Sequence, residues 1–105
     1  MFGRNNNRIV EDVYRTNDGG AHFCFRFVEE GNGNWRADIQ SQPSYGSRSS
    51  GLHDSHRLPS ITAKTRHQIC YGTTPRSLRD AQKWAEAWAE ATWTWIRDGR
   101  RVKNF

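Results

Sequence analysis

The chain has 105 residues and a formal net charge of +5, and 34% of its residues are hydrophobic while 12% are aromatic. This length predicts a single domain over residues 1–105, with a modest core built mainly from large rings. The sequence has neither an apolar run long enough to span a membrane nor the apolar segment of a signal peptide, so we expect a cytoplasmic protein with no membrane partner.

The first half of the chain carries the pattern of antiparallel strands. Residues 8–16 are rich in β-branched and aromatic side chains, which predicts an edge strand. In residues 21–29 three phenylalanines alternate with other side chains, and the alternation resumes in 35–40 after a turn rich in Gly and Asn. We therefore expect a hairpin here, and a fourth strand over residues 64–71.

Between these strands, residues 42–63 show no hydrophobic period and are crowded with Ser, Gly and Pro. A loop of this length is uncommon in a compact domain and tends to be functional or disordered. We predict one long loop over this segment. Residues 1–7 and 100–105 are expected to be flexible tails.

One helical period accounts for nearly every residue of 75–98. Thr74 and Pro75 suit the start of a helix and Gly99 suits its end. The period places Trp84, Trp88 and Trp95 on one broad apolar side. The expected fold class is therefore α+β: an antiparallel four-stranded sheet in the order ββββα, with one long C-terminal amphipathic helix packed on one face. Trp88 should pack against Phe25.

Trp93 does not fit this apolar side. It falls among the polar residues of the helix, so we expect it to be exposed to solvent. Two interpretations stay open: a lone surface aromatic shielded by Arg97, or an anchor for a partner, because tryptophan is enriched at binding hot spots.

Basic residues concentrate in residues 43–76, where five Arg and Lys stand against one Asp. On the face of the sheet away from the helix, the pattern also exposes several arginines. We therefore predict a site for nucleic acid or another partner on this basic sheet face and the long loop, or, as the alternative, a plain solvated face. The residues assigned to this site are Arg26, Arg36, Tyr45, Arg48, Arg57, Lys64, Arg66 and Trp93.

Metal and enzyme chemistry have weaker signals. The spacing His53-x2-His56-x10-His67-x2-Cys70 resembles a set of zinc ligands. However, three residues along one strand would send His67 and Cys70 to opposite faces. No catalytic motif surrounds the histidines or thiols, so we expect no metal, no cofactor and no enzymatic activity. A metal-dependent enzyme that uses the His-rich loop remains the last alternative.

Several short runs resemble a group of small uncharacterised proteins carried on bacterial mobile elements such as phages, plasmids or integrative elements. They are QPSYGSR at 42–48, HRL at 56–58, Ile69-Cys70, and the helix pattern from Ala85 to Gly99. The resemblance implies only a mobile-element setting. Small proteins in that setting often bind nucleic acid or block host defence complexes, as anti-CRISPR proteins do.

Together these observations predict a small basic non-enzymatic binding protein whose partner is nucleic acid. The alternative is an anti-CRISPR-like inhibitor that docks on a host defence protein or nucleoprotein complex.

Overall fold

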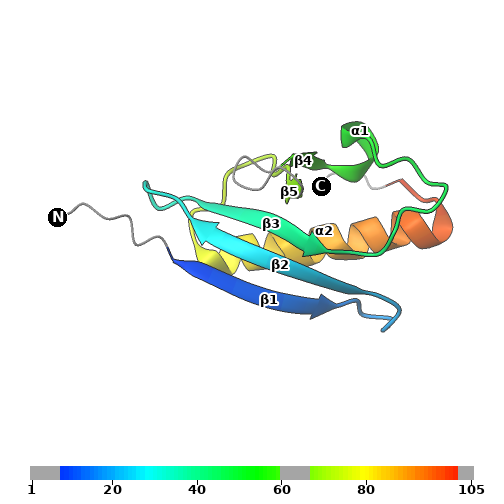
Figure 1. Cartoon of the computed structure of the whole chain (residues 1–105), viewed down its shortest axis with the longest axis horizontal. Helices are drawn as coiled ribbons and strands as arrows, with labels where there is room; N and C mark the ends of the chain where they lie inside the picture. Colours follow the sequence, from blue (N-terminus) through cyan, green and yellow to red (C-terminus); the bar gives the residue numbers. More distant parts are fainter. Residues whose placement is uncertain (1–7, 60–66, 102–105) are drawn as a thin grey trace.

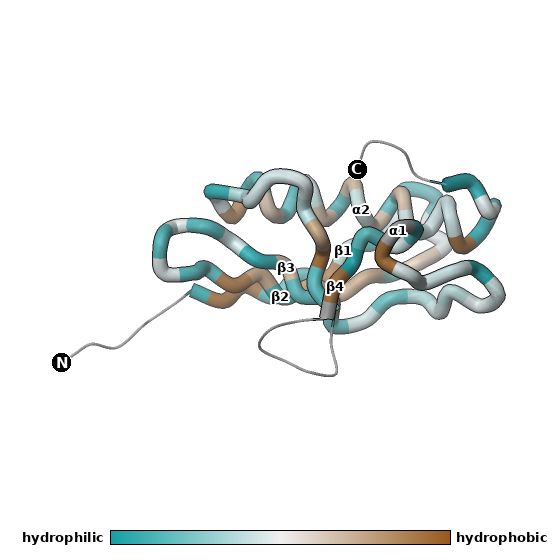
Figure 2. Tube along the Cα trace, turned by 90° about the horizontal axis from the view of Figure 1, so that it is seen from above, coloured by the Kyte–Doolittle hydropathy of each residue, from teal (hydrophilic) through white to brown (hydrophobic). Residues whose placement is uncertain are grey.

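The computed structural model describes residues 8–59 and 67–101, without the side chains of His53 and Pro59, as two layers: a sheet and a long helix (Figures 1 and 2). The sheet has the order β1-β2-β3-β5-β4, and every neighbouring pair is antiparallel. The predicted α+β class is confirmed. The elements are β1 (Ile9–Arg15), β2 (His22–Glu29), β3 (Trp35–Ser41), α1 (Leu52–Ser55), β4 (Arg57–Pro59), β5 (His67–Ile69) and α2 (Leu78–Asp98).

The sheet has five strands and not the four expected, because the predicted loop at 42–63 contains α1 and β4. The chain leaves β3, forms α1, and returns as β4 on the far side of β5 (Figure 1). A strand of three residues is too short to show a hydrophobic period. Of the fourth strand expected at 64–71, His67–Ile69 is observed, while residues 64–66 and the predicted tails at 1–7 and 102–105 lie outside the described part.

The core lies between α2 and the face of the sheet that carries the phenylalanines of β2. Phe25 and Trp88 are each 1% exposed, with ring centroids 6.0 Å apart in an edge-to-face arrangement, so the predicted contact is confirmed. The Trp88 indole Nε1 also donates a hydrogen bond to the Ser55 carbonyl oxygen at 2.8 Å. One side chain thus holds the sheet, α2 and α1 together.

The long helix begins later than its period suggested. Ser77 is the N-cap and its hydroxyl accepts a hydrogen bond from the Asp80 backbone N–H at 3.0 Å. Pro75 is buried before the helix, and its carbonyl oxygen accepts the Trp35 N–H at 2.9 Å, which ties this segment to β3. The predicted end at Gly99 is confirmed by its φ of 70°. Neither helix in the described residues is long and apolar enough to cross a membrane.

The prediction that Trp93 is exposed is wrong: it is half-buried and packs against the core. Its Nε1 donates to the Asp18 carboxylate at 2.8 Å, and a Cβ on Gly20 would lie 2.9 Å from its ring. The helical period places Trp93 away from the sheet but cannot show that the β1–β2 turn folds over it. Tyr14 reinforces this contact by donating to Glu90 of α2.

The carboxylate of Asp18 gives this turn a dependence on pH. Hydrogen bonds, first from the Gly20 N–H and then from Trp93, hold its pKa well below the ordinary value of 3.8. A carboxyl whose folded pKa is lowered stabilises the fold above its unfolded pKa and loses that contribution as the pH falls through the folded value. The wild type should therefore lose more stability between about pH 4 and pH 2 than Asp18→Asn. Denaturant unfolding across this range measures it, and parallel curves would contradict the assignment.

Candidate functional site

A hollow of about 390 Å³ opens on the segment between β3 and β4. None of the described residues that line it is acidic. The lining combines two guanidinium groups with uncharged polar side chains: Gln42, Ser44, Tyr45, Arg48, Ser50 and Arg57. The composition of this hollow is that of an anion-binding site, and its residues come from two places in the fold.

Tyr45 anchors the segment that forms one wall. The residue is 8% exposed, and its carbonyl oxygen accepts the Arg48 N–H at 2.9 Å, which closes a turn. Gly46 takes a φ of 59° inside this turn, a conformation that glycine adopts without strain. Burial raises the pKa of the Tyr45 phenol, so the side chain stays neutral at physiological pH.

Arg57 reaches the hollow from β4. It pairs with the buried Ile69, so it lies on the α2 side of the sheet. Its guanidinium carbon lies 4.8 Å from the centroid of the Tyr45 ring, and its Nη1 donates to the Gln42 side-chain oxygen at 2.9 Å. Stacking on one side and an amide at the edge hold the guanidinium plane in place.

Arg48 lies in the segment between β3 and α1 and packs against the C-terminal end of α2. Its Nε donates to the Ile96 carbonyl oxygen at 3.4 Å, and its guanidinium lies 6.0 Å from the Trp95 ring centroid. The group also rests on Gly99, where a Cβ would come within 2.7 Å of the guanidinium carbon. Arg48 therefore caps the helix, where a positive charge is favoured by the helix dipole.

Carboxylates in the described residues offset the positive charge of the hollow only in part: the pKa of Asp98 is lowered mainly by its hydrogen bond with Arg97 and more weakly by the charge of Arg48. Neither Arg48 nor Arg57 forms an ion pair there, whereas Arg97 pairs with Asp18 at 2.6 Å and Asp98 at 2.7 Å. The neighbouring His67 adds no charge at physiological pH, because burial and then Arg57 lower its pKa. Two fixed guanidinium groups thus offer N–H donors to an anion.

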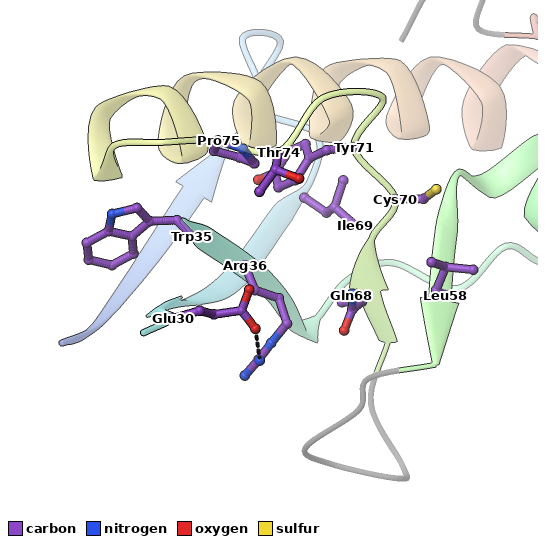
Figure 3. A pocket seen from close by; sticks show the side chains of 10 residues that line it. All are labelled: Glu30, Trp35, Arg36, Leu58, Gln68, Ile69, Cys70, Tyr71, Thr74 and Pro75. Atoms are coloured by element: carbon purple, nitrogen blue, oxygen red, sulfur yellow. Dashed lines mark hydrogen bonds and ion pairs between the residues drawn. The ribbon is translucent and has the colours of Figure 1, made fainter. Parts of the chain in front are cut away.

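The predicted basic sheet face is not formed as expected. Arg36 is 7% exposed, and its Nη1 pairs with Glu30 at 3.0 Å (Figure 3). Its Nε pairs with Asp38, also at 3.0 Å. The physical reason is ion pairing within the sheet: Asp38 lies two residues along the same face of β3, and Glu30 lies in the turn before β3, so both carboxylates meet the guanidinium. Arg36 belongs to a buried ion pair and not to an open binding surface.

The other predicted arginines do not converge on one surface either. Arg26 is half-buried on the outer sheet face, between its cross-strand partners Glu11 and Asp38. Arg48 and Arg57 lie on the side of α2 instead. Lys64 and Arg66 lie outside the described residues. The structure therefore divides the predicted site and leaves the loop part, Tyr45, Arg48 and Arg57, as one cluster.

A second hollow, of about 240 Å³, lies between the start of β3, β5 and the segment before α2 (Figure 3). Its two charged lining residues, Glu30 and Arg36, already pair with each other. The remaining lining is Trp35, Leu58, Gln68, Ile69, Cys70, Tyr71, Thr74 and Pro75. This hollow presents no free charged group to an anion.

The zinc alternative gains no support. Within the described residues, no three His, Cys, Asp or Glu side chains gather closely enough to hold a metal ion. His67 lies on the α2 side of the sheet, while Cys70 lines the hollow of Figure 3 and meets His56 through a backbone hydrogen bond of 2.8 Å. The side chain of His53 lies outside the described part.

Sequence reasoning missed three polar residues of the loop hollow, Gln42, Ser44 and Ser50. Polar loop residues have no period, and the only available signal was the serine-rich composition around Arg48. No protein-family model, curated protein or solved structure matches the chain. The similarity to mobile-element proteins remains a prediction.

Proposed function

We propose that the protein is a non-enzymatic nucleic-acid-binding protein that holds the phosphate backbone in the hollow formed by Tyr45, Arg48 and Arg57. One observation carries the proposal: Arg48 and Arg57 converge on one open hollow, and no acidic residue is among its described lining. Neither arginine forms an ion pair within the described residues. Guanidinium groups match phosphate oxygens with paired N–H donors, and low mobility reduces the entropy lost on binding.

Phosphate recognition fits this site better than base recognition. Bases in single strands are usually bound by stacking on open aromatic faces. Here the ring of Tyr45 is buried and lies under Arg57, and Trp95 lies under Arg48. Since the guanidinium groups occupy these ring faces, the site can bind the phosphate backbone of nucleic acids of many sequences but makes few base contacts.

The surroundings of the hollow strengthen its positive field. Arg100 follows the end of α2 with a side chain that is 77% exposed and lies 4.0 Å from the Asp98 carboxylate, which Arg97 holds more closely. The acidic residues close to this end are engaged: Asp98 with Arg97 at 2.7 Å, and Asp54 with Arg101 at 2.9 Å. A polyanion that enters the hollow therefore meets further positive charge around Gly99.

The dependence of affinity on salt tests the proposal. Each phosphate contact releases counterions, so the logarithm of the binding constant falls by about 0.9 per contact for duplex DNA against the logarithm of the salt concentration. Arg48→Gln/Arg57→Gln should remove about two phosphate contacts, so the slope should become less steep by the amount that two contacts contribute. Binding at low salt should also weaken. Fluorescence anisotropy with labelled duplex and single-stranded oligonucleotides measures both the salt slope and the affinity at low salt.

Because Arg48 also caps α2, the melting temperature of each variant is measured first, and Arg48→Lys serves as a control that keeps the charge. An unchanged slope in the double variant would overturn the assignment of the hollow. A wild type that binds neither DNA nor RNA would leave the alternative, docking on a host defence protein or nucleoprotein complex.

A further inference from the structure

The edge of the sheet formed by β1 leaves half of its backbone groups without a partner strand in the described chain (Figure 1). The Glu29 N–H donates to the Arg8 carbonyl oxygen at 2.9 Å, and the Thr16 N–H donates to the Ala21 carbonyl oxygen at 3.0 Å. Since backbone groups alternate between the two sides of a strand, the even-numbered residues bond to β2. The groups that face outward belong to Ile9, Glu11, Val13 and Arg15.

The side chains at this edge are unusual for an unpaired strand. Val13 is 68% exposed and Ile9 is 48% exposed. Both lie on the sheet face away from α2, on either side of Glu11. Edge strands in monomeric proteins are normally protected by charges, bulges or short length, because open N–H and carbonyl groups recruit other strands. Here two charges of opposite sign, Glu11 and Arg15, flank an exposed apolar residue, Val13, at the centre of a regular edge.

We propose that β1 pairs antiparallel with β1 of a second copy of this chain, centred on Val13, so that the two sheets become continuous across a two-fold axis. This pairing sets Val13 opposite Val13 of the second copy. It also sets Glu11 opposite Arg15 and Asp12 opposite Tyr14. By symmetry the Glu11–Arg15 pair occurs twice, so four complementary charges meet across the interface.

The charge pattern favours a second copy as the partner and disfavours the two registers next to Val13 on the Glu11 side. A pairing centred on Glu11 would place two Glu11 carboxylates directly opposite each other, and one centred on Asp12 would do the same with Asp12. Like charges directly opposite are destabilising, whereas the Val13 register pairs opposite charges. Arg15 forms no ion pair within the described residues, and Glu11 uses one carboxylate oxygen to accept Gln40 at 3.0 Å.

The pairing does not disturb the contacts between β1 and its own helix. Asp12 and Tyr14 point toward α2, where they bond to Gln82 and Glu90 of the same chain. Self-association uses the opposite edge of the molecule from β4, which carries Arg57. The inference therefore goes beyond the proposed binding function and does not depend on it.

Disulfide trapping tests the register. In a Cys24→Ser/Cys70→Ser background, Val13→Cys should form a disulfide-linked dimer under mild oxidation, because directly opposite residues lie within the range of a disulfide. Replacing Cys24 also prevents a bond within one chain, since it lies opposite Val13. Glu11→Cys should give no disulfide-linked dimer, because this register separates the two copies of residue 11 by four positions, about 13 Å. Equal trapping at both positions, or none at Val13→Cys, would overturn the proposal.

Sedimentation equilibrium of the untrapped full chain tests the association itself. The wild type should dimerise, and Val13→Lys should raise the dimer dissociation constant at least about tenfold by setting two like charges opposite each other. Glu11→Arg should also weaken the dimer, and Glu11→Arg/Arg15→Glu should restore it. A wild type that stays monomeric, or a swap that restores nothing, would contradict pairing through this edge.

Discussion

Replacing Trp88 with alanine will lower the free energy of unfolding by about 3–5 kcal/mol, because it leaves a large cavity at the centre of the core. The side chain is 1% exposed and its ring meets those of Phe23 and Phe25 at 5.7 and 6.0 Å. It also satisfies the Ser55 carbonyl oxygen. A loss of this size is a large share of the stability of an ordinary domain.

Chemical denaturation followed by circular dichroism measures this loss. Trp88→Phe is the matched control, because it keeps most of the ring volume and removes the hydrogen bond, so its cost should fall well below that of alanine. If Trp88→Ala unfolds at the same denaturant concentration as the wild type, α2 cannot pack on the sheet as described.

The second large effect is expected at the buried ion pair of β3. Asp38→Ala should cost about 3–5 kcal/mol, because it leaves the guanidinium of Arg36 without the buried one of the two carboxylates, Asp38 and Glu30, that it meets at 3.0 Å. Arg36 is 7% exposed and Asp38 is 2% exposed. The remaining partner, Glu30, is 38% exposed and offers weaker compensation.

A double variant separates the loss of the pair from the cost of an unpaired charge. Arg36→Met/Asp38→Leu removes both charges and keeps the volume, so it should be more stable than Asp38→Ala. Chemical denaturation followed by circular dichroism measures the stability of both variants. If Asp38→Ala is nearly as stable as the wild type, Arg36 is solvated, and the sheet face regains its place as a candidate binding surface.

The parts of the fold that were predicted correctly depend on local periods. The alternation in β2 and β3 and the helical period of α2 identified the layers and the contact of Trp88 with Phe25. The misplaced helix start has a tertiary cause, since Pro75 is bound to Trp35 of β3 before the helix begins. No local pattern reports a contact of that kind.

The errors at the site have the same origin. Arg36 was assigned to an open face because the sequence does not show that the carboxylates of Glu30 and Asp38 both close on its guanidinium. Trp93 was placed in solvent because the turn that covers it lies far away in the sequence. Tyr45, Arg48 and Arg57 were selected from charge and loop composition alone, and their grouping into one hollow depends on the burial of Tyr45 and the C-terminal end of α2.

The central claim, that the loop hollow binds the phosphate backbone, is tested most directly by two variants that lose the same charge. Arg48→Gln/Arg57→Gln alters the hollow, whereas Arg79→Gln/Lys83→Gln alters exposed residues of α2 outside it. Affinity for one labelled oligonucleotide is measured by anisotropy at one salt concentration, with folded protein in each case. We expect the hollow pair to lose about tenfold or more in affinity and the helix pair to lose only about threefold or less, since phosphate contacts act locally and net charge acts weakly at a distance. Equal losses, or a larger loss from the helix pair, would contradict the claim.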